Sequence, residues 1–199
     1  MSRWCGLTGG IASGKSTVGA FLRERGAAVV DADLLAREVV ERGSPALEEL
    51  AACFGTRVLL PDGRLDRAAL GAIVFHDAAA LAALNAITHP RIAALAAERA
   101  RAFVAAGAPL VFYEAALLVE NGLHHGLDAL VVVWVPPDVQ LLRLIARDGF
   151  SEADARARIA SQRSLDEKRR LATHVIDNSG EREATRAQTA RVHDELLRG

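Results

Sequence analysis

Residues 5–17 read Cys5-Gly6-Leu7-Thr8-Gly9-Gly10-Ile11-Ala12-Ser13-Gly14-Lys15-Ser16-Thr17, and this stretch decides the fold of the chain. Gly9, four further residues and then Gly14-Lys15-Ser16 fit the phosphate-loop pattern G-x-x-x-x-G-K-S/T. Glycines allow the backbone to turn tightly, so that successive N–H groups point inward and the following helix directs its positive end at the same point. Such a concavity binds phosphate, and the sequence therefore predicts a nucleotide site.

Both flanks of this stretch have the context that a phosphate loop requires. Trp4 to Thr8 is typical of a short buried strand, and Val18, Phe21 and Leu22 form the apolar stripe of a helix that ends at Gly26. A chance glycine-rich turn carrying Lys and Ser is the alternative, and this context disfavours it. We expect Lys15 to reach the β- and γ-phosphates, and Ser16 to supply one oxygen to a Mg²⁺ ion.

The composition restricts the class of protein. The chain has 199 residues, 51% of them hydrophobic and 25% charged, which suits one well-packed core domain with insertions. A net charge of -1 argues against a nucleic-acid surface. Cys5 and Cys53 form neither a metal spacing nor a disulfide framework. With no signal-peptide pattern and no apolar run of membrane length, we expect a cytoplasmic protein that does not bind membranes. We also expect a monomer.

A pair of acids follows the second expected strand, Ala27 to Val30, and precedes a helix expected over Leu34 to Val40. Strand ends of a parallel sheet face its ligand crevice. Asp31 and Asp33 are therefore candidates for the proton acceptor of a kinase, and strand alternation would place both on one side. The alternative is a helix cap with a solvated neighbour. We favour a catalytic role for Asp33.

Residues 40–107 are predicted to form a helical insertion. Ser44 and Pro45 begin one helix, which ends at Gly55, and Asp62-Gly63 is a turn. Asp66 to Ala106 is alanine-rich and helical, with predicted breaks at His76-Asp77 and His89-Pro90. The polar groups that suit a cleft are Arg64, Arg67, His89 and Arg91, although from the residues alone solvated helix faces, or an N-cap for His89, are the stronger interpretation.

The remaining strands complete an α/β fold. We expect strands over Pro109 to Tyr113, followed by Glu114, over Leu127 to Val135 and over His174 to Asp177, with a closing helix over Glu181 to Leu197. Five strands separated by helices predict a doubly wound, five-stranded parallel sheet in the order 2-3-1-4-5, with a helical insertion and a helical lid.

The lid is expected between the fourth and fifth strands. Pro136-Pro137-Asp138 opens a helix that carries Arg143 and Arg147, and Ser151 caps a second helix that is expected to run past Arg163. Arg143 and Arg147 lie four residues apart, on one helix face, where like charges repel unless an anion lies between them. We favour a role at the transferring phosphoryl group. The alternative is a solvated face with Asp138 and Asp148 as partners.

Several stretches together resemble the dephospho-CoA kinase family, over nearly the whole chain. They are Leu7-Thr8-Gly9-Gly10-Ile11-Ala12-Ser13-Gly14-Lys15-Ser16-Thr17, Val30-Asp31-Ala32-Asp33-Leu34-Leu35-Ala36-Arg37, Leu84-Asn85-Ala86-Ile87-Thr88-His89-Pro90, Leu117-Leu118-Val119-Glu120-Asn121, Arg143-x-x-x-Arg147-Asp148 and Val175-Ile176-Asp177-Asn178-Ser179-Gly180. The resemblance implies phosphorylation by ATP of the ribose 3′-hydroxyl of dephospho-CoA. The alternatives are a nucleoside or nucleotide kinase with another acceptor, or a slowly hydrolysing switch protein, although the chain lacks the Asn-Lys-x-Asp element of guanine-reading switches.

The resemblance also implies the parts and their residues. Residues 1–39, 108–137 and 164–199 would form the nucleotide-binding core, 40–107 the acceptor-binding insertion and 138–163 the lid. ATP and Mg²⁺ would be held by Gly10, Ile11, Ala12, Ser13, Gly14, Lys15, Ser16 and Thr17, with Asn178 near the adenine and Ser16 on the metal. Asp33 would be the general base, Arg143 and Arg147 would act with Lys15 in catalysis, and the acceptor, a small molecule, would meet Asp33, Arg64, His89 and Glu114.

Two positions depart from the pattern of that family. Ala12 stands where the family often has Gly, which predicts that this loop position has an ordinary φ. Ala115-Ala116 stands where a Pro commonly precedes Leu-Leu, which predicts a less rigid loop after the third strand.

Overall fold

The computed structural model describes residues 2–75 and 77–199 and divides the chain into two compact units. The first unit contains the residues up to Asp31 together with Ala100–Gly199, and the second contains Ala32–Arg99. Contacts within the chain thus separate a sheet-containing unit from a helical one. The functional parts expected from the sequence, with limits at residues 39, 107, 137 and 163, stay predictions.

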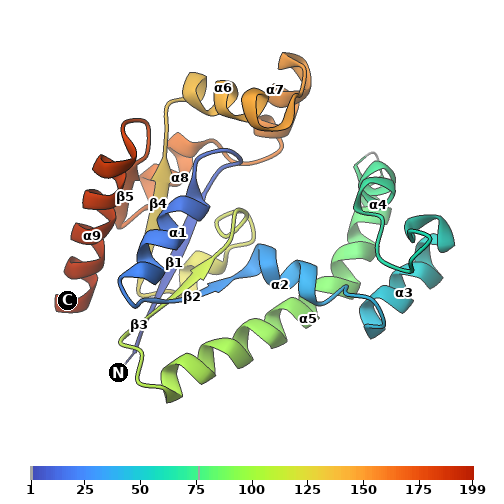
Figure 1. The fold of residues 1–199 in the computed structure, drawn as a ribbon, viewed down its shortest axis with the longest axis horizontal. Coiled ribbons are helices and arrows are strands. Elements are labelled where there is room, and N and C mark those ends of the chain that lie inside the picture. The colour runs from blue at the N-terminus through green and yellow to red at the C-terminus, as the bar shows by residue number, and fades with distance from the viewer. Residues whose placement is uncertain (1, 76) are drawn as a thin grey trace. The chain divides into compact units, whose positions relative to one another are not determined.

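A five-stranded parallel sheet organises the first unit (Figure 1). Its strands are β1 (Arg3–Gly9), β2 (Ala28–Asp31), β3 (Leu110–Glu114), β4 (Ala129–Trp134) and β5 (His174–Asp177). Their order is β2-β3-β1-β4-β5, and every pairing is parallel. The predicted fold class and strand order are therefore confirmed. Because the strands run the same way, their carboxyl ends meet at one edge, where the loop after β1 lies.

Apolar residues of the strands and of two helices form the core of this unit. Cys5, Leu7, Phe112, Val131 and Ile176 project from the strands and are completely buried. The helices α1 (Lys15–Glu24) and α9 (Arg182–Arg198) pack side by side and contribute Val18, Leu22, Val192 and Leu196. In Figure 1 both helices cover the same side of the sheet, while α8 (Leu165–Leu171) packs against β4. A core packed on both faces holds the strand ends in fixed positions.

The region between β4 and β5 contains one more helix than the sequence predicted. The helix α6 (Pro137–Asp148) agrees with expectation, but α7 (Glu152–Ala160) ends before Gln162 and Arg163, so the expectation that it runs past them was wrong. The separate helix α8 follows. Its cause is a capping box, in which Ser164 Oγ accepts from Glu167 N at 3.2 Å and the Glu167 carboxylate accepts from Ser164 N at 3.0 Å.

The second unit is helical. It contains α2 (Ala32–Glu38), α3 (Pro45–Phe54), the 3-10 turn η1 (Thr56–Val58), α4 (Arg67–Val74) and the part of α5 (Ala78–Ala105) that precedes Ala100. Ser44 caps α3 as predicted, since its hydroxyl accepts from Leu47 N at 3.2 Å. Leu50, Phe54, Val58 and Leu70 lie in a core of its own.

The long helix α5 corrects one prediction. The sequence predicted a break at His89-Pro90, and an N-cap was one interpretation of His89, but α5 continues through Pro90 to Ala105. Pro90 removes one backbone hydrogen bond, and the alanine-rich segments on both sides have the highest helix propensity, so that the helix persists. The other predicted break includes His76, which lies outside the described residues. Asp77 beside it caps α5 by accepting from Ala79 N and Ala80 N at 2.8 and 3.0 Å.

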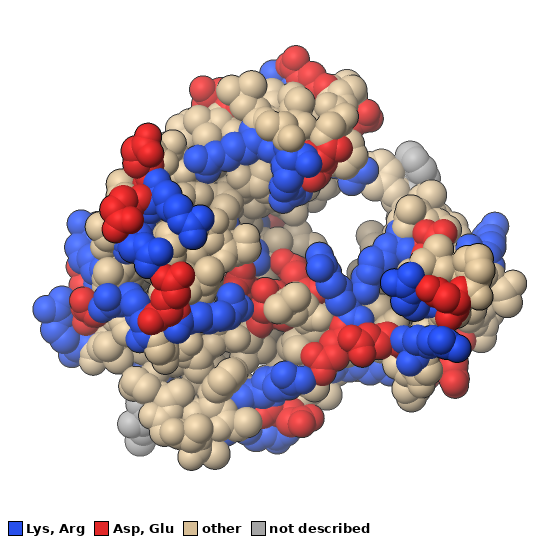
Figure 2. Space-filling model, viewed as in Figure 1, with Lys and Arg blue, Asp and Glu red and all other residues tan. Residues whose placement is uncertain are grey.

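The surface carries both signs of charge. Figure 2 shows Lys and Arg side chains interspersed with Asp and Glu over the face in view, and the chain as a whole has a net charge of -1. No helix built from residues 2–75 or 77–199 combines the length and the apolar character needed to cross a bilayer.

Candidate functional site

The phosphate-loop segment follows β1 at the carboxyl edge of the sheet. Ser13 N donates to Gly10 O at 3.1 Å within the turn, and Gly14, at φ 85°, precedes the first residue of α1. Lys15 and Ser13 are buried, whereas Ser16 is exposed on the first turn of the helix. The Ser16 hydroxyl is thus accessible at the amino end of α1, where the helix dipole favours anions.

The backbone at Ala12 corrects a second prediction. The sequence predicted an ordinary φ for this alanine, but its φ is 59°, in the left-handed region. Only glycine adopts this region without steric cost, because a Cβ approaches the following carbonyl oxygen. Ala12 is the one non-glycine residue at positive φ that the structure describes. The surrounding structure therefore holds the loop in a conformation that the alanine alone disfavours.

Asn178, the residue after β5, is hydrogen-bonded to the phosphate loop. Its Nδ2 donates to Ser13 O at 2.8 Å, and its Oδ1 accepts from Thr185 Oγ1 at 2.8 Å. Asn178 and Thr185 are both buried. The amide lies so close to the loop that a Cβ at Gly14 would stand 2.0 Å from Asn178 Nδ2. Glycine at position 14 is therefore needed both for its φ and for this close approach.

An open cavity of about 290 Å³ brings together residues from separate parts of the sequence. Its walls come from the loop, from α6 and from the segment after β5, namely Ala12, Gly14, Thr17, Arg143, Asn178, Gly180 and Arg182. Arg143 is fixed there because its Nη1 donates to Asn178 O at 2.8 Å. Two arginines beside a glycine-rich turn give this cavity positively charged walls, which suit an anionic ligand. Arg182 was missed by the sequence reasoning, which read position 182 only as part of the closing helix.

Arg147 has a different environment from Arg143. Its Nε and Nη2 donate to the two carboxylate oxygens of the adjacent Asp148 at 2.7 and 2.8 Å, and its side chain is 56% exposed. This bidentate pair raises the pKa of Arg147 and lowers that of Asp148. The partner that the sequence offered as the alternative is therefore present here, and Arg147 lies outside the described walls of the cavity.

A chain of paired charges, of which Lys15 and Glu114 are buried, connects the loop with the ends of β2 and β3. Lys15 Nζ donates to Glu114 Oε1 at 2.9 Å, and Arg23 Nη2 contacts Glu114 Oε2 at 3.3 Å and Asp31 Oδ2 at 3.8 Å. The Glu114 side chain is completely buried, and burial raises its pKa although Lys15 opposes this effect. Glu114 holds the ammonium group of Lys15 at the end of β3, and its expected place at the acceptor stays a prediction.

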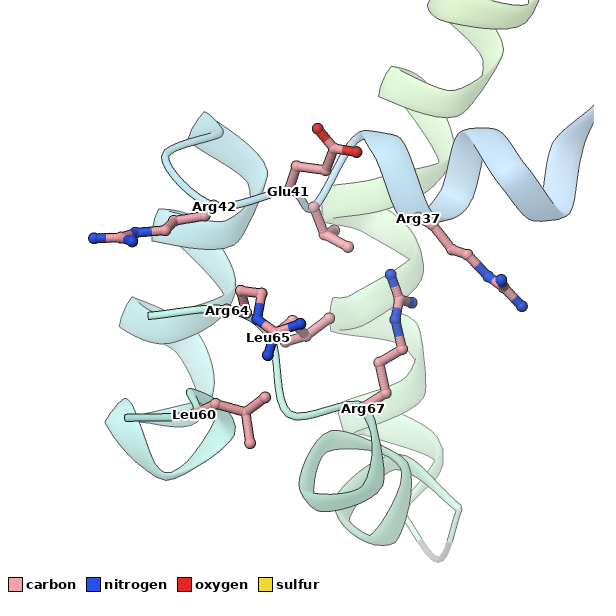
Figure 3. A pocket seen from close by; sticks show the side chains of 8 residues that line it. Arg37, Glu41, Arg42, Leu60, Arg64, Leu65 and Arg67 are labelled. Carbon is pink, nitrogen blue, oxygen red and sulfur yellow. The ribbon is translucent and has the colours of Figure 1, made fainter. Parts of the chain in front are cut away.

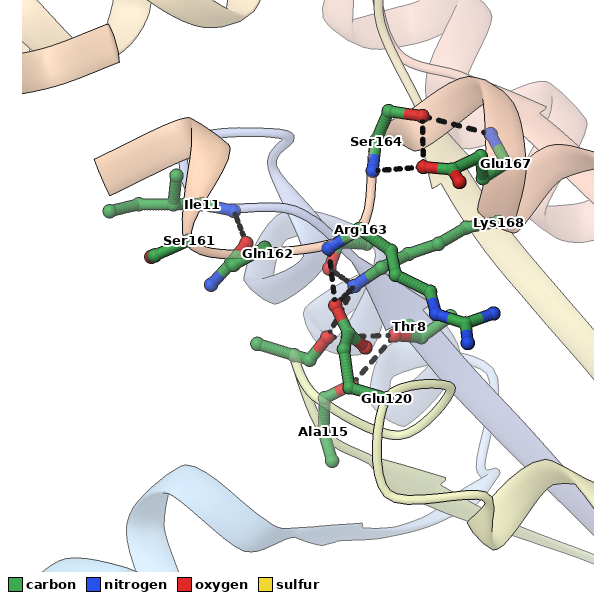
Figure 4. A network of polar contacts seen from close by, with 12 residues as sticks. Thr8, Ile11, Ala115, Glu120, Ser161, Gln162, Arg163, Ser164, Glu167 and Lys168 are labelled. Carbon is green, nitrogen blue, oxygen red and sulfur yellow. Dashed lines mark hydrogen bonds and ion pairs between the residues drawn. The ribbon is translucent and has the colours of Figure 1, made fainter. Parts of the chain in front are cut away.

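A second polar network joins α8 to the loop, and the sequence reasoning missed its central residue, Lys168 (Figure 4). Lys168 is fully buried, and its Nζ contacts Glu120 Oε1 at 2.9 Å, Ala116 O at 2.7 Å and Gly9 O at 3.3 Å. Burial lowers the pKa of Lys168, and Glu120 opposes that effect. The capping box after Ser164 could have revealed α8, but no local pattern indicates which residue Lys168 contacts.

The second unit has cavities of its own beside the residues expected at the acceptor. One of about 460 Å³ is lined by Arg37, Arg64 and Arg67 among others, and one of about 320 Å³ by Arg67 and His89 among others. In Figure 3 the guanidinium of Arg67 lies between α2 and the segment of Arg64, whereas Arg42 extends away. Burial lowers the pKa of Arg67, and nearby Arg37 lowers it further.

Two arginines that the sequence offered for a cleft, Arg64 and Arg91, make ion pairs with acids of the same unit. Arg64 Nε donates to Asp62 Oδ2 at 2.7 Å, and Arg91 pairs with Glu49 at 2.6 Å rather than lining a described cavity. Asp33 lies in the first turn of α2, which begins at Ala32, so the strand alternation expected for it does not apply. Asp33 thus follows the end of β2 by two residues, on a helix.

No cluster within the described ranges supplies three His, Cys, Asp or Glu ligands for a metal. A divalent cation at this site would therefore depend on the exposed Ser16 hydroxyl together with the oxygens of a bound nucleotide. This donor set of hydroxyl and phosphate oxygens fits Mg²⁺, which keeps several waters and binds few protein ligands.

Comparison with known proteins gives one consistent result. The family model for dephospho-CoA kinase matches residues 3–184. A dephospho-CoA kinase of Anaeromyxobacter dehalogenans (strain 2CP-C) is 53% identical over 197 residues, which are 99% of this chain and 93% of the relative. A dephospho-CoA kinase structure from Campylobacter jejuni has a TM-score of 0.74 and 29% identity, covering 100% of this chain and 99% of the other. The crystal structure of TT1252 from Thermus thermophilus has a TM-score of 0.82 and 39% identity, with 97% of each chain covered.

Proposed function

This chain belongs to the dephospho-CoA kinase family, and from that membership we propose how its residues share the work of the family's reaction. The reaction transfers a phosphoryl group from ATP to the ribose 3′-hydroxyl of dephospho-CoA, giving coenzyme A and ADP in the last step of coenzyme A biosynthesis. The observation that carries the assignment of residues is the loop of Gly9–Thr17 at the carboxyl edge of the sheet, with Lys15 buried on Glu114 and Ser16 exposed.

The loop binds the phosphates of ATP in this proposal. Backbone N–H groups of the loop beyond Ile11 surround the anion, and Lys15 neutralises charge on the β- and γ-phosphates. Glu114 holds the Lys15 ammonium at the end of β3 with an N···O distance of 2.9 Å, so that the cation is already oriented before ATP arrives. Ser16 would bind Mg²⁺, whose charge offsets the charge that shifts during transfer.

Asp33 is proposed as the general base. The 3′-oxygen of the acceptor attacks the γ-phosphorus, the bond between this phosphorus and the β,γ-bridging oxygen breaks, and ADP leaves. The hydroxyl proton passes to the Asp33 carboxylate. Its position two residues after Asp31, the last residue of β2, supports this role because that strand ends at the same sheet edge as the loop.

Arginines are proposed to serve the two substrates separately. Arg143 and Arg147 of α6 would meet the transferring phosphoryl group, and the cavity that Arg143 already lines with Asn178 supports the first of these roles. The acceptor is assigned to residues 40–107 with Arg64 and His89. The support is a cavity of about 460 Å³ rimmed by Arg37, Arg64 and Arg67, which suits the anionic part of a nucleotide-derived acceptor.

Substitution of Asp33 tests the assignment of the base. Asp33→Asn should lower kcat by ~10²- to 10⁴-fold, as for a lost general base, and leave the dissociation constant of ATP nearly unchanged. Asp194→Asn is the matched control, because this exposed acid of α9 pairs with Arg25 and has no proposed role. If Asp33→Asn chiefly abolished ATP binding, the acid would be a metal-binding or structural group instead.

Acceptor specificity tests the substrate. Contacts made by residues 40–107 to the part of dephospho-CoA remote from the 3′-hydroxyl should orient that hydroxyl, so a shortened acceptor should lose turnover as well as affinity. We expect kcat/KM for dephospho-CoA at least ~100-fold above that for adenosine or AMP, which corresponds to about 2.7 kcal/mol. Equal values would favour a nucleoside or nucleotide kinase, and ADP release that ignores every acceptor would favour a switch protein.

A further inference from the structure

The main chain of Ile11, inside the phosphate-loop segment, is held on both of its polar groups by glutamine side chains. Gln140 Nε2 donates to Ile11 O at 2.8 Å, and Ile11 N donates to Gln162 Oε1 at 2.9 Å. The partners fix both amide orientations, because a carbonyl oxygen requires a donor and an N–H requires an acceptor. Gln140 is 5% exposed and Gln162 is half-buried, so water competes little for either bond.

The two glutamines come from opposite ends of the α6–α7 hairpin. Gln140 lies in the first turn of α6, and Gln162 lies two residues after the end of α7. Between them the hairpin has a small core of its own, formed by Leu141, Leu144 and Ala155, and this core packs against Ile11 and Ala12. The hairpin therefore contacts the loop both through apolar side chains and through two hydrogen bonds to a single residue.

The chain that follows Gln162 is anchored separately. Arg163 N donates to Glu120 Oε1 at 2.9 Å, and the buried Lys168 binds the same carboxylate oxygen as well as Gly9 O (Figure 4). The segment that carries Gln162 is thus held in place by Glu120, and the Gln162 side chain reaches Ile11 of the loop from there. If the α6–α7 hairpin moved, the hydrogen bond from Gln140 would either break or pull Ile11 with it. The hydrogen bond between Ile11 N and Gln162 would oppose that movement of Ile11.

We propose that Gln140 and Gln162 are positioning residues that set the conformation of the phosphate loop through Ile11. They hold the peptide groups on both sides of Ile11, next to Ala12, whose φ of 59° an alanine does not adopt by its own preference. The next N–H groups along the chain are those assigned to the phosphates of ATP, so the inference rests on the proposed nucleotide site. The position of the hairpin and the affinity for nucleotide are coupled by this arrangement.

A charge-matched pair of substitutions tests the inference. Gln162→Glu keeps an oxygen that accepts from Ile11 N, whereas Gln140→Glu replaces the donor by an oxygen facing Ile11 O. Both variants add one negative charge beside the same residue, so their difference reports the hydrogen bond. We expect the dissociation constant of ADP, measured by calorimetry without acceptor, to rise about tenfold more in Gln140→Glu than in Gln162→Glu.

Further variants keep the test decisive where Gln140→Glu fails to fold. Gln162→Met removes the acceptor at similar volume, and Gln162→Glu should bind ADP several-fold more tightly than Gln162→Met although it carries the unfavourable charge. Arg156→Gln, on the exposed face of α7, is the control for substitutions in the hairpin and should match the wild type. Equal ADP affinities of Gln162→Met and wild type, or of the two glutamate variants, would overturn the inference. If wild type binds ADP but does not phosphorylate dephospho-CoA, the proposed function fails and the inference stands.

Discussion

Gly14→Ala should destabilise the protein through two separable effects. The first is backbone strain, since an alanine at φ 85° costs about 1–2 kcal/mol, partly offset by about 0.4–1 kcal/mol from the less flexible unfolded chain. The second is the clash of the new Cβ with Asn178 Nδ2, 2.0 Å away. Moving Asn178 breaks its bonds with Ser13 O and Thr185 Oγ1, at about 1 kcal/mol each. The total expected loss is about 3 kcal/mol.

Gly26→Ala provides the matched control for this measurement. Gly26 has a φ of 83°, yet nothing lies within 4 Å of the Cβ that alanine would add, so this variant should lose only about 1 kcal/mol. Urea unfolding followed by circular dichroism gives both free energies. In the Asn178→Ala background the extra cost of Gly14→Ala should disappear. Equal losses for Gly14→Ala and Gly26→Ala in the wild-type background would refute the reasoning.

Three further outcomes are expected. In the native protein a thiol reagent at pH 8 should label the exposed Cys53 quickly and Cys5 only on unfolding, because burial raises the pKa of Cys5 to about 11; two fast thiols would contradict this. Lys168→Met should cost about 3 kcal/mol in urea unfolding by leaving the Glu120 carboxylate without its cation, and adding Glu120→Gln should recover most of it. Because burial raises the pKa of Glu114 above 4.5, its folded form binds protons more tightly, and this contribution to stability is lost as pH rises through the folded pKa. As pH rises over that range, the unfolding free energy of Glu114→Gln should therefore increase relative to that of the wild type. Unfolding free energies that depend on pH in the same way in both proteins would contradict this.

The sheet and the loop could be predicted because their signals are local. Continuous apolar runs such as Val131 to Val133 mark strands buried on both faces, and the spacing from Gly9 to Lys15 marks a phosphate loop. Pro90 misled the prediction, because a single proline indicates a break only when the surrounding helix propensity is weak. The start of α8 at Leu165 had a readable capping box that was not used.

The site itself was less predictable, because its geometry depends on distant contacts. Nothing near Gln140 or Gln162 in the sequence indicates that both bind Ile11, since glutamine is equally common on solvated helix faces. The left-handed φ of Ala12 also escaped prediction, because the strain is supported by packing from the α6–α7 hairpin rather than by the loop sequence. Such features arise only after the chain has folded.

The meeting of both ends of the α6–α7 hairpin at Ile11 has a consequence for protein engineering. Because Gln140 and Gln162 bind the same residue, the distance between these two glutamines is fixed by Ile11 of the phosphate loop and does not depend on the length of the hairpin. The turn at Gly149, which joins α6 to α7, lies at the opposite end from these anchors. A fluorescent protein inserted there would leave both attachment points in place, and its signal would test whether the hairpin moves when nucleotide binds.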